Sequence, residues 1–528
     1  MYYKISCSFG EVIDKLTVLK LKLQNSNLES HSKNILSEIN TLHQECPSSK
    51  NNDKLFNFLY KINNQIWDLK DHIRNKIRLQ QFDREYIKYT VDFQRINDLR
   101  VQIKSKINLK YSSTIIEEDG NNTIGDDLQL LELIKYEYGI GNYVYANNKI
   151  QDLIDKYTHT NIKNQFIADL YISYHNICNI LNINNPHSHK LDEITDNPEK
   201  YNMGAEFINF SYQIQCGNLL LKKKYLNANK YVNYYNNISN LGTTMTFFKD
   251  GDTDKTLFIY YMGGIGDIIM LGRIVRELCN TYKQNKIKYL IDFKNLSWIF
   301  DSILSDIPNL TILYASNKNI VGHFDYHCNL MKVYNHLNYK TYESIPFLPY
   351  LNNINTKSSA KHLRLINKLT ASGKKSYIFN WHGNSNNPHE KNNRKMELKN
   401  AIPLFKQSDI NWIITSKDLT NADQNILKDF GNIFILKNEI ENYDTEQAFY
   451  DTIVIFKYIE GVISTDTSLV HLSLSMDVPT YVLLTIGSEW RWCRNCDRTN
   501  WYPKANLIRQ KKVKNWDNVI SELCNILH

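Results

Sequence analysis

The sequence predicts an α/β fold built from two doubly wound halves that face one another, preceded by two all-α regions. Two observations carry this prediction. Residues 1–118 contain almost no Gly or Pro, and their apolar residues recur at the three- and four-residue spacings of helices, a pattern that residues 119–250 continue. From residue 256 onward, short apolar runs alternate with helical stretches, which is typical of parallel strands covered on both faces.

The composition of the 528 residues is that of a globular protein, with 42% hydrophobic and 22% charged residues. The net charge of +8 suits a phosphate-bearing ligand, but it is too dilute to indicate a nucleic-acid binder. The N-terminus lacks the pattern of a signal peptide, and the longest apolar stretch, residues 257–271, is interrupted and too short to cross a bilayer. Cys493 and Cys496 form a single C-x-x-C pair, which does not complete a zinc site. We therefore expect a cytoplasmic protein without a transmembrane segment.

Residues 1–118 are expected to form an N-terminal helical bundle. Leu16 and Leu19 belong to one apolar helix face, Ile62 and Ile66 belong to another, and the polar residues 47–53 separate the two. Such a module most simply serves packing or oligomerisation. The region also resembles an uncharacterised helical family of bacterial proteins, a resemblance that brings no activity with it. The matching segments are GEVIDKLT (10–17), WDLKDHIR (67–74), NDLR (97–100), IN (107–108) and EE (117–118).

Residues 119–250 are expected to form a second helical region with some repetition. Gly141, Tyr143 and Ala146 have the spacing found at the turn and second helix of a tetratricopeptide repeat, and Tyr225 and Ala228 repeat part of it. The small alanine lets two helices approach closely. We expect a region like tetratricopeptide repeats, through which the protein recruits an acceptor or a protein partner.

The α/β part is expected to consist of residues 255–360 and 375–528, with a helical and then polar stretch, 361–375, between them. Two doubly wound halves that face one another form a cleft at the carboxyl ends of their strands, where ligands bind. Eight strands are expected, at residues 257–262, 288–291, 310–313, 376–380, 412–415, 433–436, 461–464 and 480–484.

A glycine turn follows the first of these strands. Gly264 and Gly266 permit a tight turn and the close approach of a ligand, and the next helix offers its positive N-terminus to that ligand. Asp267 stands in the first turn of this helix. A carboxylate at that position can be an electrostatic cap, but here it would also point into the cleft.

A polar turn follows the strand expected at 461–464. The free backbone N–H groups of Thr467, Ser468 and Leu469 would cradle a diphosphate at the start of a helix, and His471 lies one turn beyond Thr467. Asp466 precedes them, so the same residues can also be read as a simple N-cap.

Taken together, these segments resemble glycosyltransferase family nine, the heptosyltransferase-like enzymes of GT-B architecture, and especially the branch fused to tetratricopeptide repeats. The resemblance covers residues 255–528. Its matching segments are GGIGD (263–267), FDYHCNLM (324–331), IPFLPYL (345–351), NWHGN (380–384), RKMEL (394–398), DTSLVHL (466–472), EWRW (489–492), NWYP (500–503), RQ (509–510) and WD (516–517). Tyr261-Met262 and Ser473-Leu474 depart from the branch near the cleft, so the donor and acceptor identities do not carry over.

The resemblance implies an inverting hexosyl- or heptosyltransferase-like enzyme whose substrate is a nucleotide-sugar donor, with neither a cofactor nor a metal. Asp267 matches the general base, and Arg394 matches the basic residue at the phosphates, with Lys395 or Lys417 assisting. Without the resemblance, Arg394 would be read as a surface residue of a polar loop. The acceptor is expected to be a glycan or another hydroxyl compound. The alternatives are an inactive scaffold that binds a nucleotide sugar or a glycan, and a protein O-glycosyltransferase.

Two further clusters allow more than one reading. Asp250, Asp252 and Asp254 resemble the Asp-x-Asp motif of metal-dependent enzymes, but a solvated turn explains them better. The aromatic residues that follow the last expected strand can stack on a sugar or a base, although rings this dense more often serve packing near the cleft mouth or against the C-terminal helix. They are Trp490, Trp492, Trp501 and Tyr502.

Overall fold

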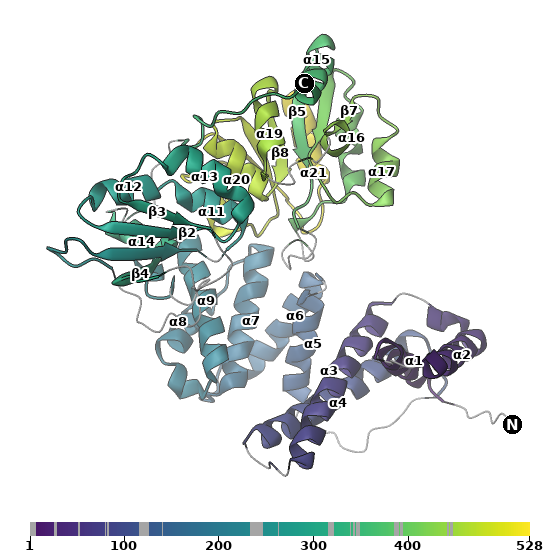
Figure 1. Ribbon diagram of the computed structural model, residues 1–528. Coiled ribbons are helices and arrows are strands. Elements are labelled where there is room, and N and C mark those ends of the chain that lie inside the picture. The colour runs from purple at the N-terminus through teal and green to yellow at the C-terminus, as the bar shows by residue number, and fades with distance from the viewer. Residues whose placement is uncertain are drawn as a thin grey trace. The chain divides into compact units, whose positions relative to one another are not determined.

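The computed structural model describes residues 7–25, 29–50, 53–79, 81, 84–115, 126–139, 141–232, 247–261, 263–314, 322–337, 339, 341, 344, 349–384, 390, 394–440, 443 and 447–528 (Figure 1). Three segments named in the sequence analysis lie outside these residues: Met262, 116–118 and 345–348. The chain divides into two compact units, Met1–Ile134 and Lys135–His528. Among the described helices, none has both the length and the apolar character that a membrane span requires.

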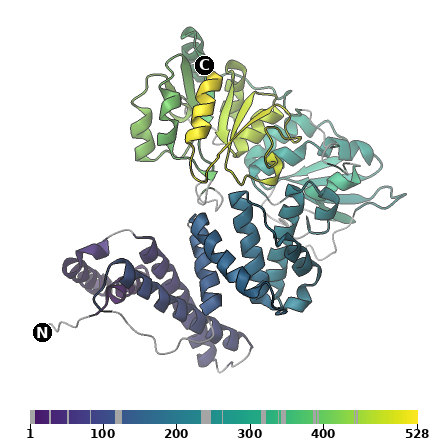
Figure 2. The ribbon, with the colours of Figure 1, turned by 180° about the vertical axis from the view of Figure 1, so that it is seen from behind.

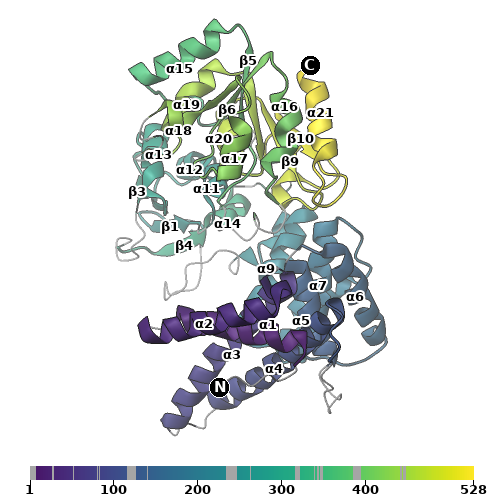
Figure 3. The ribbon, with the colours of Figure 1, turned by 90° about the vertical axis from the view of Figure 1, so that its right-hand side faces the viewer.

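The first unit contains four long helices: α1 (Phe9–Gln24), α2 (Glu29–Glu45), α3 (Lys54–Arg78) and α4 (Arg84–Lys110). Helix α3 packs along α4, and α1 packs against both (Figure 3). The polar break expected at 47–53 contains the short 3-10 helix η1 (Pro47–Lys50) and Asp53, which caps α3 by accepting a hydrogen bond of 2.8 Å from the Leu55 N–H. Ile62 and Ile66 of α3 are buried, but Ile77 near its end is 47% exposed.

Four residues that carry the resemblance of this unit belong to a polar network between α1, α3 and α4: Gly10, Asp14, Arg100 and Asn108. The Asp14 carboxylate accepts hydrogen bonds from Asn63 Nδ2 and Arg100 Nε, both at 2.8 Å, and Asn108 accepts one from the Gly10 N–H at 2.5 Å. A Cβ atom at Gly10 would lie 2.6 Å from the Lys104 carbonyl oxygen, so α1 approaches α4 this closely only with glycine. A packing role therefore accounts for these four residues, whereas most of the matching segment 67–74 on α3 is exposed.

The second unit begins with helices that cover residues 135–232. They are the end of α5 (Asp126–Gly139), α6 (Tyr143–Tyr157), α7 (Gln165–Leu181), α8 (Ser188–Asp196), the 3-10 helix η2 (Pro198–Tyr201), α9 (Ala205–Leu221) and α10 (Tyr225–Ala228). Ala146 and Ala228 are fully buried, as expected where two helices approach closely. The assignment to tetratricopeptide repeats stays a prediction.

The first sheet of the α/β part is parallel, with strand order β3-β2-β1-β4. Its strands are β1 (Thr256–Tyr260), β2 (Lys286–Leu290), β3 (Leu310–Leu313) and β4 (Tyr326–Asn329). The connecting helices are α11 (Ile265–Gly272), α12 (Val275–Thr281), α13 (Ser297–Leu304) and α14 (Leu330–His336).

The second sheet is also parallel, with strand order β10-β9-β8-β5-β6-β7. Its strands are β5 (Lys375–Asn380), β6 (Ile410–Ile414), β7 (Ile433–Ile435), β8 (Gly461–Thr465), β9 (Thr480–Leu484) and β10 (Ala505–Arg509). The helices are α15 (Ala360–Ala371), α16 (Ile402–Phe405), α17 (Asn421–Leu427), α18 (Leu436–Glu439), α19 (Tyr450–Ile455), α20 (Ser468–Ser475) and α21 (Asp517–Leu527).

Both faces of the second sheet are covered by helices. Ile378 and Val462 belong to the hydrophobic core shared with α15, α19 and α20, whereas the next residues, Phe379 and Ile463, belong to the core shared with α16, α17 and α21. Figure 2 shows α21, in yellow, lying across that second face. The predicted parallel α/β architecture is confirmed, because neighbouring strand residues are buried on opposite faces.

Two strands were not predicted, and both lie at the edges of their sheets. Strand β4 pairs only with β1, and β10 pairs only with β9. Both strands contain polar or charged residues, such as His327 and Arg509, so neither appears in the sequence as a continuous apolar run.

Helix α9 shares a hydrophobic core with the α/β part. Cys216, Leu219 and Leu220 pack in one cluster with Leu271 of α11 and Trp501. Trp490 and Trp501 therefore pack on the α9 side, and the C-terminal helix α21 is covered by other residues. Of the two places expected for this packing, the one against α21 does not apply to Trp490 and Trp501, because they belong to the core cluster of α9 and not to that of α21.

Candidate active site

The glycine turn after β1 brings α11 into contact with α20. Gly264 is the N-cap of α11, with extended backbone angles, and its carbonyl accepts hydrogen bonds from Asp267 N and Ile268 N at 3.0 and 3.2 Å. A Cβ atom at Gly266 would lie 2.5 Å from His471 Cδ2 and 3.3 Å from Ser468 Cα. Helix packing is thus one reason why position 266 must be glycine, and the contact brings the first turn of α11 next to the first turn of α20.

The polar turn after β8 presents the N-terminus of α20. Thr467 is the N-cap residue, but its side chain makes no capping hydrogen bond. Its hydroxyl lies 3.0 Å from Ser464 Oγ instead. The first turn of α20 also carries no acidic residue. The reading of this turn as an ordinary side-chain cap therefore does not apply, and the helix N-terminus is suited to an anionic ligand.

A pocket of about 540 Å³ joins the two turns. Eight predicted site residues line it: Gly264, Gly266, Asp267, Arg394, Asp466, Thr467, Ser468 and His471. The pocket lies where the carboxyl ends of β1, β5 and β8 lead into loops, which is the place expected for a ligand in facing doubly wound halves.

Arg394 stands among three carboxylates of the pocket. Its Nη2 lies 3.4 Å from Asp466 Oδ2 and 3.6 Å from Glu489 Oε1, and its Nε lies 4.0 Å from Glu390 Oε1. Burial alone would raise the pKa of Asp466, but the guanidinium groups of Arg394 and Arg491 outweigh it and hold this pKa below the ordinary value. Arg394 is therefore a half-buried cation of the pocket, not a surface residue of a polar loop.

Asp267 forms an ion pair with Arg491, a residue of the 3-10 helix η10 (Trp490–Trp492). Burial raises the pKa of the Asp267 carboxyl, the Arg491 guanidinium lowers it, and Glu489 and Asp466 raise it further. The net pKa lies above the ordinary value for aspartate. A half-buried carboxyl group with a raised pKa and an adjacent cation has the character of a general base.

His471 is buried in its neutral form. Burial lowers its pKa to about 3, although its Nε2 lies 3.8 Å from Asp466 Oδ1. Its Nδ1 lies 3.0 Å from the Tyr502 hydroxyl, and its ring lies 5.3 Å from that of Trp492. Trp492 and Tyr502 thus pack beside the site without lining the pocket.

Two predicted donor-binding residues lie elsewhere. Leu469 is buried in the hydrophobic core, although the backbone of a first-turn residue can still face a ligand. Lys417 lines a separate pocket beside α17 and β7, where its ammonium group lies 5.3 Å from the ring centre of Tyr443. Lys395 is exposed and does not line the Asp267 pocket.

Sequence reasoning did not name eight residues that line this pocket: Gly263, Ile265, Phe293, Gly383, Asn384, Glu390, Glu489 and Arg491. Six of them stand in segments that carry the family resemblance, but the resemblance gave them no role. Glu390 had no such signal. It lies in a polar loop, yet its side chain is buried next to Arg394.

The aspartates at 250, 252 and 254 lie in the turn before β1. The Asp252 carboxylate accepts a hydrogen bond of 2.8 Å from the Lys249 N–H, and Asp254 pairs with Lys286 at 2.8 Å. None of the three is among the residues that line the Asp267 pocket.

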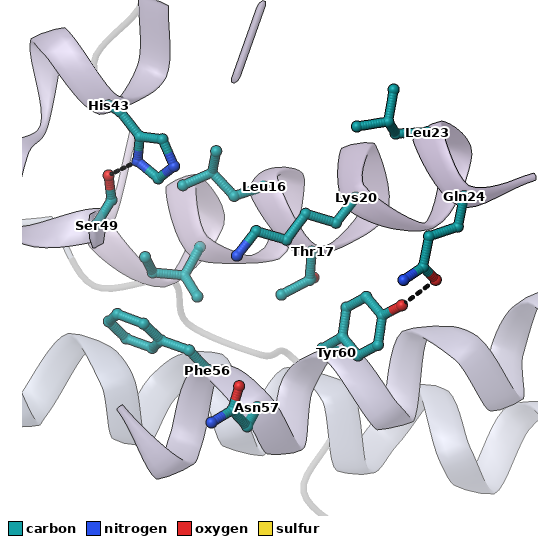
Figure 4. A pocket seen from close by; sticks show the side chains of 11 residues that line it. Leu16, Thr17, Lys20, Leu23, Gln24, His43, Ser49, Phe56, Asn57 and Tyr60 are labelled. Atoms are coloured by element: carbon teal, nitrogen blue, oxygen red, sulfur yellow. Dashed lines mark hydrogen bonds between the residues drawn. The ribbon is translucent and has the colours of Figure 1, made fainter. Parts of the chain in front are cut away.

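The first unit contains a pocket of its own, of about 620 Å³, between α1, α2, η1 and α3 (Figure 4). Ile13, Leu16 and Phe56 form its apolar part. Hydrogen bonds join His43 to Ser49 and Tyr60 to Gln24 at its two ends. One of these contacts joins α2 to η1, and the other joins α3 to α1.

A scan against models of protein families gives no match, and no curated protein matches the sequence. Three solved structures that resemble part of the chain are glycosyltransferases. The glycosyl transferase family 9 protein from Veillonella parvula is 12% identical with a TM-score of 0.36, over 52% of this chain and 96% of its own. The E. coli ADP-heptose lps heptosyltransferase II is 14% identical with a TM-score of 0.35, over 52% and 98%. The E. coli heptosyltransferase WaaC with ADP-2-deoxy-2-fluoro heptose is 10% identical with a TM-score of 0.31, over 52% and 100%. At such identities and TM-scores, the function has to be argued from the residues of the chain itself.

Proposed function

We propose that this protein is an inverting, metal-independent glycosyltransferase that moves a sugar from a nucleotide-sugar donor to a hydroxyl group of a glycan or another acceptor. The observation that carries the proposal is the pocket between α11 and α20. It places a carboxylate with a raised pKa, Asp267, in the same small volume as an arginine and an open helix N-terminus. These are the groups that glycosyl transfer from a diphosphate requires, and the sequence resemblance to glycosyltransferase family nine points to the same chemistry.

The diphosphate of the donor would lie at the N-terminus of α20. Its oxygens would accept hydrogen bonds from the backbone N–H groups of the Thr467–Leu469 turn and from Arg394. As the bond between the anomeric carbon and the phosphate oxygen breaks, negative charge collects on the leaving nucleoside diphosphate. Fixed positive groups stabilise that charge without having to reorganise, which is the role a metal ion plays in other transferases.

Asp267 would accept the proton of the attacking hydroxyl group. The acceptor oxygen then forms its bond to the anomeric carbon on the face opposite the departing phosphate, so the configuration at that carbon inverts. Asp267 belongs to α11 in the first half, whereas the protein groups that would bind the diphosphate belong to the second half. The base and the leaving group would therefore lie on different sides of the sugar. A carboxylate that acts in this way contributes about 10²–10⁴-fold to the rate.

The substitution Asp267→Asn tests this role. The amide keeps the shape of the side chain but does not accept a proton, so we expect turnover to fall at least about a hundredfold. Donor binding should stay near normal and the melting temperature should not fall, because the neutral amide has no cost of ionisation in this site. Transfer is measured with a mixture of nucleotide sugars in the presence of EDTA, after a thermal-shift screen has identified the nucleoside diphosphates that bind.

Three other outcomes would contradict the proposal or replace it by one of the alternatives. A variant that melts several degrees lower but turns over normally would make Asp267 a capping residue. A wild-type protein that binds a nucleotide sugar and never transfers it would be a binding scaffold. Incorporation of a labelled sugar into protein, with none in carbohydrate, would identify a protein O-glycosyltransferase.

A further inference from the structure

Arg491 is the charged residue of the pocket that contacts both halves of the α/β part. Its Nη2 pairs with Asp267 Oδ1 on α11, and its Nη1 lies 3.8 Å from Asp466 Oδ2 in the turn before α20. Only 7% of its side chain is exposed. A buried arginine held between two carboxylates is a fixed charge whose field acts on both of them at short range.

The surroundings of Arg491 fix the position of its guanidinium group. The group lies 5.3 Å from the centre of the Trp490 ring, and the Arg491 carbonyl accepts a hydrogen bond of 2.5 Å from Thr499 Oγ1. Trp490 packs on Trp501, and Trp492 packs on His471 and Tyr502. The packing of these aromatic residues therefore fixes the position of η10 and of the Arg491 side chain.

We infer that Arg491 is a positioning residue of the proposed reaction, which keeps Asp267 ionised and aimed into the cleft so that it can accept a proton. This inference rests on the proposed function. Without a neighbouring cation, a buried carboxyl group retains its proton to a higher pH and is no acceptor. Arg491 offsets that effect with its positive charge and with the hydrogen bond that its Nη2 donates to Asp267 Oδ1.

Asp267 has other charged neighbours, and each must be considered. Glu489 precedes η10, Asp466 precedes α20, and Arg394 faces the pocket from its own loop. His471 of α20 lies against Gly266 but is held neutral by burial. The two acidic neighbours favour the protonated form of Asp267 and the two arginines favour the ionised form. Arg491 has the largest effect of the four and makes direct contact.

The acid limb of the pH profile of kcat/KM tests the inference. Arg491→Gln and Arg491→Met remove the charge, and Met fills a similar volume without an unpaired polar group. We expect either variant to move the acid limb upward by about one pH unit or more. Arg491→Lys keeps a charge and should keep the limb close to its wild-type pH. Arg273→Gln is the matched control. Arg273 is also an arginine beside α11, but it donates hydrogen bonds to the carbonyl oxygens of Met270 and Trp501 at the other end of the helix. Its loss should leave the acid limb unmoved.

A lower rate at every pH with an unmoved limb would overturn the inference, since a merely structural arginine would give that result. If the wild-type protein transfers no sugar from any donor, the proposed function fails, and a measurement without turnover then decides the role of Arg491. This measurement is the difference in free energy of unfolding between the wild type and Asp267→Asn as a function of pH.

The sign of that difference follows from linkage. The pKa of Asp267 is higher in the folded than in the unfolded protein, so the folded state binds more protons between the two values and the wild type loses stability as pH rises through that range. The Asn variant has no such loss. The free energy of unfolding of the Asn variant should therefore increase relative to that of the wild type as pH rises. The difference should become constant above the pKa that Asp267 has in the folded wild type. In an Arg491→Met background the levelling should occur at higher pH, and an unchanged curve would overturn the inference.

Discussion

At the scale of single residues, Arg394 shares a small volume with three carboxylates. Each of its contacts to Asp466, Glu489 and Glu390 is 3.4 to 4.0 Å long, so no one partner holds it in the manner of a close ion pair. A diphosphate can therefore compete for this guanidinium without breaking a short hydrogen bond. Removing Arg394 would leave three acidic side chains facing the anionic ligand.

We predict that Arg394→Ala weakens the binding of a nucleoside diphosphate by about 1.5–3 kcal/mol, the range for charge-assisted hydrogen bonds. Isothermal titration calorimetry with the nucleoside diphosphate selected by the thermal-shift screen measures this. Lys395→Ala is the control, because the neighbouring Lys395 is exposed and lies outside the pocket. Equal affinities for the wild type and Arg394→Ala would remove Arg394 from the site.

At the scale of elements, the contact between α11 and α20 sets the geometry of the site. Both helices start at the pocket, and the missing side chain of Gly266 lets the first turn of α11 rest against Ser468 and His471. Helix α11 follows a strand of the first sheet, and α20 follows a strand of the second. Their contact therefore fixes the distance between Asp267 in one half and the proposed phosphate site at the N-terminus of α20 in the other.

We predict that Gly266→Ala lowers the free energy of unfolding by about 1–3 kcal/mol, because the added methyl group overpacks this contact. It should also weaken nucleoside diphosphate binding, since α20 must shift. Gly217→Ala is a matched control in α9. A Cβ atom there meets nothing within 4 Å, so alanine should stabilise the helix by up to about 1 kcal/mol. Denaturant unfolding of both variants checks the pair, and equal stabilities would refute the packing argument.

At the scale of the whole molecule, α9 belongs to the folded core of the α/β part. Its apolar side chains lie in one cluster with Leu271, Met331, Trp490 and Trp501. A boundary near residue 250 follows the change of sequence pattern, but it separates α9 from the surface that this helix covers. The structure therefore favours a functional unit that includes the helices before β1.

We predict that a fragment of residues 126–528 folds and binds the same nucleoside diphosphate as the full chain. A fragment that starts near residue 241 should melt at a lower temperature and aggregate, because it exposes Trp490, Trp501 and their apolar neighbours. Thermal melts followed by circular dichroism compare the two. If the shorter fragment is as stable as the longer one, the contact between α9 and the α/β part contributes little to the stability of the fold.

The sequence by itself determined the fold class and the places where chemistry is concentrated. Continuous apolar runs specify buried parallel strands, and a glycine turn or polar turn after such a run marks the carboxyl end of a sheet, where ligands bind. Asp267, Thr467 and Ser468 could be predicted for this reason. Their positions follow from local order along the chain, which a sequence records directly.

Only the tertiary structure decided which distant residues complete the site. Arg491 lies 224 positions after Asp267, and no periodicity or spacing relates the two. Glu390 stands in a polar stretch of the sequence, yet its side chain is buried against Gly383 and Arg394. Lys417 follows a strand of the correct sheet, yet it lines another pocket. The physical reason is that burial and ion pairing depend on how the helices of the two halves pack against each other. The local pattern of one sequence does not reveal which distant residues this packing brings into contact.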